Sequence, residues 1–266
     1  MLGKAPEDIS KTERNAIGKV SELAFGYGGG VGALQTMMPP TMKMVDYWDI
    51  VQTLEGGVYE EALEAWDVWG CERNAGAVDY DEWIACEMVK RAWRNKHPAI
   101  VVLWKACEEA AKSAVDKPLT TFMAGEHLAF KALSFKGHNY LLMRMPSGGF
   151  LVYFNPRLED DGSLTYMGVD PITKQWVRQG TYGGKLVENS CQSLSRDILA
   201  YNMHRMGPEG YALVLTVHDE VITETPDTNE YSHESLSAIL ATNPPYAKGF
   251  PLAAGGFEAY RYRKDD

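Results

Sequence analysis

Two adjacent carboxylates, Asp219 and Glu220, stand between two short apolar runs of the chain. The flanking runs have the composition of β-strands, so we expect a hairpin with the carboxylates at its tip. Charges at the tip of a buried hairpin lose hydration, which a partner ion, hydrogen bonds or a shifted pKa must replace. A divalent metal with oxygen ligands is the obvious partner. The alternative is an ordinary solvated turn, because acidic residues are common at hairpin ends.

A second candidate lies near the N-terminus. The sequence Ser-Lys-Thr-Glu at 10–13 is a capping box, and it predicts a helix that ends at the glycines of 28–30. Positions four apart form one stripe of this helix, made of Asn15, Lys19, Leu23 and Tyr27. A lysine in the middle of the stripe suits a phosphate, because an ammonium group needs no bidentate geometry. The alternative is a surface helix whose lysine extends into solvent.

The 266 residues have an ordinary globular composition, 45% hydrophobic and 23% charged. This length allows one large domain or two closely packed ones. No uninterrupted apolar stretch approaches the roughly 20 residues that cross a bilayer, and the N-terminus lacks the layout of a secretory signal. The four cysteines form no CxxC pair, which argues against a zinc site and for reduced thiols. We therefore expect a cytoplasmic protein with no membrane role.

The net charge of −10 counts against a simple nucleic-acid coat, which would be basic. The charge is unevenly distributed along the chain. Residues 55–82 carry nine acids against Arg73 alone, whereas residues 83–117 carry seven cations against four acids. The first segment should avoid phosphate, and the second is a candidate phosphate-facing surface. The alternative is that both are merely exposed helix surfaces.

The elements that must position these residues follow from local patterns. Residues 45–115 should be mainly helical, with tryptophans at helical spacings that serve as core anchors. Residues 127–182 alternate in polarity and are rich in β-branched and aromatic residues, which predicts strands. A Pro-Ser-Gly-Gly sequence at 146–149 predicts a hairpin turn between two of them.

The last third of the chain should supply the helix and strand that precede the carboxylate pair. A helix is expected from Gly184 to Met206, followed by the apolar strand that leads into Asp219. Beyond the carboxylates we expect a short helix at 234–240 and a proline-fixed loop at 244–251.

Three ordered segments carry a resemblance to a known family: residues 18–33, residues 182–197, and Thr-Val-His-Asp-Glu at 216–220. They resemble the fingers-helix motif, the primer-template helix and the palm metal motif of the A-type DNA polymerases, specifically the phage-encoded branch. The resemblance covers essentially the whole chain, including the segments at 93–98 and 245–251.

This resemblance implies an α+β fold and a partial polymerase right hand. A helical, fingers-like region would cover 1–118, and a palm-like region with an antiparallel sheet and flanking helices would cover 119–266. The implied activity is DNA synthesis on primer-template DNA, in which the primer 3′-hydroxyl attacks the α-phosphate of a dNTP. Two Mg²⁺ ions are implied as cofactors. If the chain is phage-encoded, it would act in the bacterial host cytoplasm.

In the first segment, the resemblance implies that Lys19 contacts the nucleotide phosphates and that Tyr27 lies near the sugar and the templating base. Leu23 joins this nucleotide-binding set, although many bacterial members carry an aromatic residue at its position. The family's arginine one turn before the lysine would fall on Asn15, and the adjacent Arg14 is the candidate to replace it.

In the second segment, Lys185 and Gln192 match positions that contact the primer backbone and the minor-groove edge of the terminal base pair. Glu188 or Asn189 is a further candidate for DNA binding. A minor-groove amide suits a polymerase, because the acceptors in that groove are nearly independent of sequence.

In the third segment, His218 is similar to the residue that supports the primer terminus. Asp219 resembles the metal-binding carboxylate, and Glu220 is its neighbour. With Lys19, the two carboxylates make up the catalytic set that the resemblance implies.

The sequence departs from the family in one respect. The family's first palm aspartate, together with the thumb before it, should precede Ser10, and Asp8 cannot replace that aspartate because it lies in the approach to the fingers helix. We therefore expect an N-terminal partner fragment to supply the aspartate and the thumb. Without the strand that carries the aspartate, the edge beside 214–217 would stay open for pairing.

Three hypotheses remain open at this stage. The chain is a polymerase fragment that becomes catalytic with its partner, and is inactive alone. Alternatively, it is a non-catalytic remnant that binds DNA or nucleotide. The third hypothesis is a structural or interaction protein, which requires the three ordered segments to be coincidence.

Overall fold

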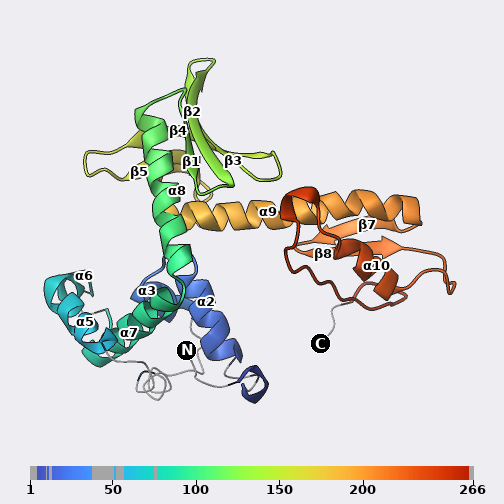
Figure 1. Ribbon diagram of the computed structural model, residues 1–266, viewed down its shortest axis with the longest axis horizontal. Helices are drawn as coiled ribbons and strands as arrows, with labels where there is room; N and C mark the ends of the chain where they lie inside the picture. Colours follow the sequence, from blue (N-terminus) through green and yellow to red (C-terminus); the bar gives the residue numbers. More distant parts are fainter. Residues whose placement is uncertain are drawn as a thin grey trace.

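The computed structural model describes residues 5–9, 11, 14–37, 51, 57–74 and 77–263. Figure 1 shows helices near the N-terminus, a sheet beside the long helix α8, and a hairpin with a short helix along the far part of α9. The fold is mixed α and β with a six-stranded antiparallel sheet, as expected. Within the described ranges, no helix is long and apolar enough to cross a membrane.

Residues 14–25 are helical and lead into the predicted glycine stop. Its elements are η1 (Pro6–Asp8), a π-helical turn η2 (Arg14–Lys19), α2 (Val20–Phe25) and α3 (Val31–Met37). The chain turns between α2 and α3 at Gly28, whose φ of +80° lies in the left-handed region that favours glycine. The predicted helix end is confirmed, whereas Ser10, Thr12 and Glu13 of the capping box lie outside the described residues.

Where the structure describes it, the next part of the chain is mainly helical, as predicted. Its elements are α5 (Val58–Ala65), a π-helical turn η3 (Trp66–Gly70), α6 (Cys71–Asn74), α7 (Tyr80–Lys96) and α8 (Pro98–Asp116). Asp79 caps α7 by accepting a hydrogen bond from the Asp81 N–H at 3.0 Å. Trp83, Trp93 and Trp104 are buried in one core, which confirms their prediction as packing anchors. Trp48 lies outside the described residues.

The oppositely charged segments meet between α5 and α7. Arg91 donates to Glu61 at 2.9 Å and to the buried Glu87 at 3.0 Å. Lys90 also pairs with Glu87, and burial lowers the pKa of this lysine. Part of the basic segment therefore compensates charges inside the protein, so it is not wholly a phosphate-facing surface.

The sheet is a meander in which each strand pairs with the next one along the chain. Its strands are β1 (Thr121–Ala124), β2 (Leu128–Phe135), β3 (His138–Arg144), β4 (Phe150–Leu158), β5 (Leu164–Val169) and β6 (Trp176–Thr181). The predicted turn at 146–149 joins β3 to β4, which pair with Tyr140 opposite Phe154. The prediction missed β1, which begins before residue 127.

One face of this sheet packs on α8 and on the start of α9. Phe130, Leu141 and Met143 point to that face and are fully buried. Burying a leucine or phenylalanine side chain contributes about 1.5 to 3 kcal/mol, so this packing is the main support of the sheet.

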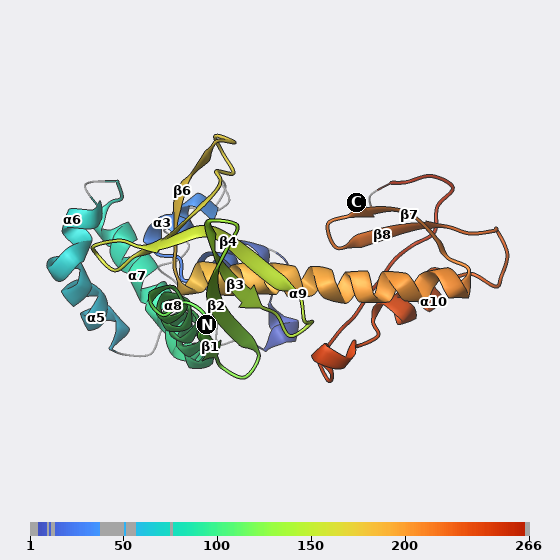
Figure 2. The same cartoon turned by 90° about the horizontal axis from the view of Figure 1, so that it is seen from above.

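Helix α9 connects the sheet to the C-terminal part, as Figure 2 shows. The elements are α9 (Gly183–Met206), η4 (Gly207–Glu209), β7 (Ala212–Val217), β8 (Glu220–Glu224), α10 (His233–Leu240) and η5 (Pro245–Ala247). The two predicted helices are confirmed to within a residue, and the predicted strand before Asp219 is present as β7. Asn202 of α9 donates to the carbonyls of Leu240 and Thr242, each at 2.9 Å, and so holds the end of α10.

The β7–β8 hairpin is exposed, and the expectation of a buried hairpin is wrong for this structure. Leu213, Val214 and Leu215 of β7 are 43%, 60% and 53% exposed. The first helical part of the chain ends at Asp116 and the six-stranded sheet begins at Thr121, but the division into fingers and palm regions at 118 stays a prediction.

Candidate functional site

The end of α2 lies directly on the start of α9. A Cβ atom added to Gly184 would lie 2.1 Å from the backbone oxygen of Tyr27, and one added to Gly183 would lie 2.0 Å from the backbone oxygen of Trp104. Real Cβ contacts are not this short, so only glycine fits at either position. The structure therefore joins the first two of the three predicted segments at a close backbone contact.

The phenol of Tyr27 faces polar groups of α9. Partial burial raises its pKa, and the neighbouring Cys191 and Glu188 raise it further. The phenol therefore stays neutral near neutral pH and can both donate and accept a hydrogen bond. Glu188 also pairs with Lys185 at 2.9 Å. Tyr27 thus lies beside α9 residues that were predicted to contact DNA.

Two residues without a predicted role hold this joint. Arg94 of α7 donates through Nη2 to the carbonyls of Gly28 and Gly29 at 3.4 Å and 3.2 Å, and its guanidinium lies 5.8 Å from the centre of the Trp104 ring. Arg94 thereby satisfies carbonyls left unpaired after the end of α2. The family resemblance includes the segment at 93–98, but the local sequence does not indicate which residues Arg94 contacts.

The second such residue is Glu108 of α8. It accepts a hydrogen bond from the Gly183 N–H at 3.0 Å, at the first turn of α9, and pairs with Lys112 at 2.7 Å. Partial burial acts to raise the pKa of Glu108, but the hydrogen bonds from Lys112 and Gly183 outweigh it and the pKa is lowered. A carboxylate at this place caps α9, whose own N-cap residue Tyr182 makes no side-chain cap.

The predicted DNA-binding residues of α9 divide between solvent and the sheet. Gln192 is exposed, and Lys185 is partly exposed. Asn189 instead donates its amide N–H to the hydroxyl of Tyr153 on β4 at 3.0 Å. Burial raises the pKa of Tyr153 to about 12. Asn189 therefore ties α9 to the sheet, and its contact with DNA stays a prediction.

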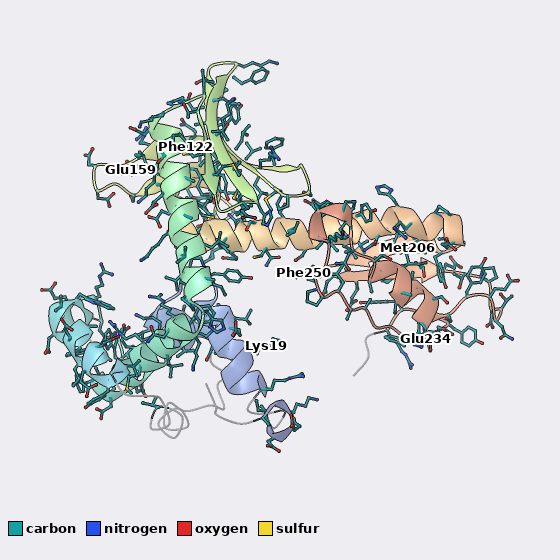
Figure 3. The ribbon with its side chains drawn as sticks, in the orientation of Figure 1. Lys19, Phe122, Glu159, Met206, Glu234 and Phe250 are labelled. Carbon is teal, nitrogen blue, oxygen red and sulfur yellow. The ribbon has the colours of Figure 1, made fainter. Side chains whose placement is uncertain are left out.

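The predicted nucleotide-binding side chains lie along the α2 segment. Arg14 and Lys19 are exposed at the two ends of η2, and Leu23 is 47% exposed on α2. Figure 3 shows Lys19 on the α2 segment, below α9 in that view. The side chain of Asn15 lies outside the described part, so the choice between Arg14 and Asn15 stays open.

The third predicted segment forms the turn of the hairpin. Val217 pairs with Glu220, which leaves His218 and Asp219 as the two turn residues. His218 has a φ of +54°, so its backbone adopts the left-handed conformation that is common in tight hairpin turns. Asp219 is exposed, and the hairpin packs on α9, whereas α2 packs on α3 and α7. The hairpin turn that carries Asp219 and the helical segment that carries Lys19 therefore pack on different elements.

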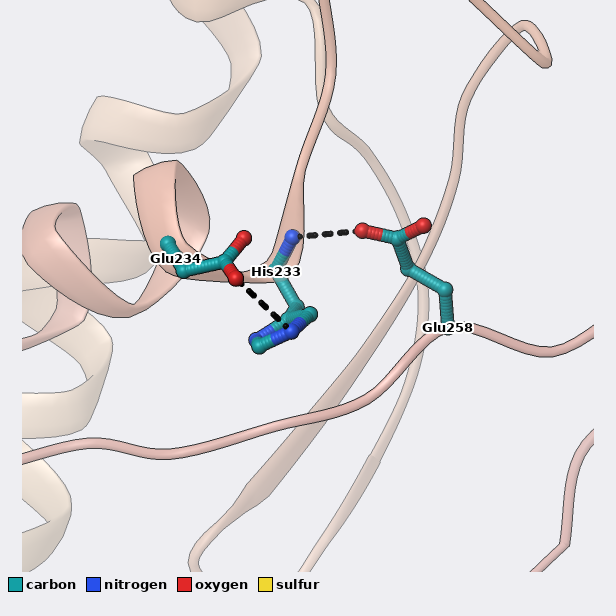
Figure 4. Close-up of side chains that lie close together, drawn as sticks. All are labelled: His233, Glu234 and Glu258. Atoms are coloured by element: carbon teal, nitrogen blue, oxygen red, sulfur yellow. Dashed lines mark hydrogen bonds and ion pairs between the residues drawn. The ribbon is translucent and has the colours of Figure 1, made fainter. Parts of the chain in front are cut away.

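A group of metal-ligating side chains occurs elsewhere. Among the described residues, His233, Glu234 and Glu258 are the group whose ligand atoms all lie within 4.8 Å of one another, and Asp219 does not belong to it. Figure 4 shows that Glu258 accepts from the His233 N–H and that Glu234 faces the imidazole. The Glu258 contact is accounted for by the start of α10, where a carboxylate satisfies a free backbone N–H, and Glu234 pairs with the ring Nε2 of the neighbouring His233.

Comparison with known proteins gives one informative likeness. The chain is 36% identical over 254 residues to the DNA polymerase of Bacillus phage SP02. The match covers 93% of this chain but 32% of that protein, so the chain spans about a third of the relative's length. No protein-family model matches the chain. No solved structure matches it either.

Proposed function

We propose that this chain is the fingers and palm part of a phage-type family A DNA polymerase and takes part in template-directed DNA synthesis. The observation that carries the proposal is the 36% sequence identity to a phage DNA polymerase, in a match that covers 93% of this chain. The contact between Tyr27 and the start of α9 supports it, because nucleotide and primer must be held next to each other for phosphoryl transfer.

Each part of the site has a role in this proposal. Lys19 binds the phosphates of the incoming dNTP, with Arg14 beside it, while Tyr27 borders the nucleotide sugar. Lys185 and Gln192 bind the primer-template duplex. His218 supports the primer terminus beside Asp219.

The carboxylates of Asp219 and Glu220 are exposed hard-oxygen donors, which suit Mg²⁺. Asp219 would hold a metal ion, with Glu220 beside it. When bound, Mg²⁺ lowers the pKa of the primer hydroxyl and offsets charge on the phosphate oxygens. A two-metal site needs a further carboxylate, and we propose that it comes from a partner segment.

The exposed β7 strand supports the proposed partner. Leu213, Val214 and Leu215 form a continuous apolar run on a strand whose second edge has no paired strand among the described residues. Such an edge is suited to accept a strand from another segment. A strand that carries the first palm aspartate and pairs here would bring its carboxylate close to Asp219.

A chimera tests the proposal directly. In it, this chain replaces the matching third of the SP02 DNA polymerase, and primer extension is measured with Mg²⁺ and dNTPs. We expect the chimera to extend a primer. Asp219→Asn should lower the rate by at least about a hundredfold, because a charged metal ligand is lost, while primer-template binding stays nearly unchanged.

The matched control is Glu224→Gln, which removes an exposed carboxylate from the same hairpin. It should extend primers nearly as well as the parent chimera. Equal primer-extension rates for the Asp219 and Glu224 variants would show that Asp219 is not a metal ligand. A folded chimera that binds primer-template but never extends it would favour the non-catalytic binding remnant instead.

A further inference from the structure

The six-stranded sheet has a second face, opposite to α8, which we call the open face. One row of residues across this face runs through Leu133, Tyr140, Phe154, Met167 and Arg178. Neighbouring rows contain Lys131, Leu142 and Val152, and then Ala129, Arg144 and Phe150. Phe150, Val152 and Trp176 are each 56% exposed, so this face is accessible.

The strands of this sheet contain no aspartate or glutamate, although the whole chain has a net charge of −10. They contain four cations, of which Lys131, Arg144 and Arg178 lie on the open face. The acids of this region stand in the turns, at Glu126, at 159–161 and at Asp170. The open face is therefore a basic surface within an acidic protein.

Aromatic rings lie between these cations. The ring centre of Phe154 is 5.2 Å from that of His138, 5.5 Å from that of Tyr140 and 5.9 Å from that of Trp176. Phe135, which pairs with His138, is 59% exposed and has the Lys136 ammonium 5.4 Å from its ring centre. Most of these rings therefore gather at one end of the open face, with Arg178 in the row of Phe154 and with Lys131 and Arg144 in the next two rows.

We infer that the open face binds single-stranded DNA. Unpaired bases stack on exposed aromatic rings, and cations in the same and adjoining rows attract the phosphates of the strand. The absence of carboxylates from the strands suits this polyanion and offers nothing to the cations of a protein partner. Duplex DNA would leave the rings unused, because its bases are already stacked and paired. This binding requires neither dNTPs nor the partner segment.

Binding of the full chain to a labelled oligothymidine of about 20 nucleotides tests the inference by fluorescence anisotropy. We expect Trp176→Ala to weaken binding about tenfold and Trp176→Phe to restore most of it, because phenylalanine still stacks. The double change Lys131→Gln with Arg144→Gln should reduce the salt slope by about 1.4, through the loss of two phosphate contacts.

The matched controls are Tyr260→Ala, which removes a tyrosine that is 97% exposed, and Lys248→Gln, which removes an exposed lysine away from the sheet. Both should bind oligothymidine like the parent. Lys185→Gln should weaken binding of a primer-template duplex and leave oligothymidine binding intact, which separates the open face from the proposed duplex site on α9.

A second readout locates the bound strand. Photocrosslinking with 5-iododeoxyuridine in the oligonucleotide should label peptides of β3, β4 and β6. No binding by the parent chain, equal binding by the Trp176 and Tyr260 variants, or crosslinks confined to α9 would each overturn the inference. Self-association that Trp176→Ala abolishes, without any DNA binding, would instead assign the open face to protein contact.

Discussion

The six-stranded sheet and the β7–β8 hairpin are both antiparallel and both apolar, yet they differ in what supports them. The sheet has one face covered by α8, with Leu141 and Met143 fully buried. In the hairpin, β7 contains Leu213 to Leu215 and leaves them about half exposed. A continuous apolar run of this kind is typical of a strand covered on both faces. The difference teaches that strand sequence specifies what a strand could bury, while neighbouring elements decide what it does bury.

A matched pair of leucine variants tests this comparison most strongly. Leu141→Ala should lower the free energy of unfolding by about 2 to 5 kcal/mol, because it leaves a cavity under the sheet. Leu215→Ala removes the same atoms from a side chain that is 53% exposed, and should cost less than about 1 kcal/mol. Urea denaturation measures both values. Equal losses would mean that the hairpin is packed as tightly as the sheet.

The link between the sheet and α9 gives a second, smaller effect at alkaline pH. Burial raises the pKa of Tyr153 to about 12, from an ordinary value of 10.0. Above pH 10 the unfolded state therefore loses this proton while the folded state keeps it, so stability falls as pH rises. Between pH 9.5 and 11.5 the Tyr153 contribution to that fall should be roughly 2 kcal/mol.

Urea denaturation of the parent and of Tyr153→Phe across this pH range measures the contribution. The variant should lose that part of the alkaline slope, and hydrogen exchange of the β7 amides should be the same in both proteins. An unchanged slope would show that Tyr153 is more exposed than its place between β4 and α9 indicates.

The smallest effect concerns the cap that joins α8 to α9. Because the folded protein lowers the pKa of Glu108, its stabilisation is present above the ordinary value of 4.5 and is lost as pH falls through the lowered pKa. Solvent screens this partly exposed pair, so Glu108→Gln should cost less than about 1 kcal/mol at neutral pH. The difference between parent and variant should shrink in acid. A stability difference between parent and variant that is constant from pH 7 to pH 3 would show that the charge of Glu108 does not contribute to the cap.

Local signals predicted elements well where the chain folds on its own pattern. The glycine stop at Gly28, the turn between β3 and β4, and the extent of α9 follow from turn chemistry and periodicity. The short strand β1 and the π-helical turn η2 were missed, because four residues carry little pattern and a π-helical turn has no local signature. Exposure of the hairpin was missed because burial depends on neighbours.

The candidate site was predictable for residues and less so for contacts. The stripe through Lys19 and Tyr27 is visible in the sequence because its members share one helix face. The contacts by which Arg94 and Glu108 hold the α2 segment and α9 in place could not be predicted, since their partners lie 65 to 75 residues away in the chain. Such pairings follow from the tertiary fold, and no local pattern encodes them.

The close contact between Gly184 and Tyr27 has a mechanical consequence. The carbonyl of Tyr27 lies so close to the backbone of Gly184 that a side chain at that position would push the two segments apart. Lys19 stands eight residues before Tyr27 on the same helical segment, which packs on α3 and α7. The absence of a side chain at Gly184 therefore helps to set how near the exposed ammonium of Lys19 stands to α9.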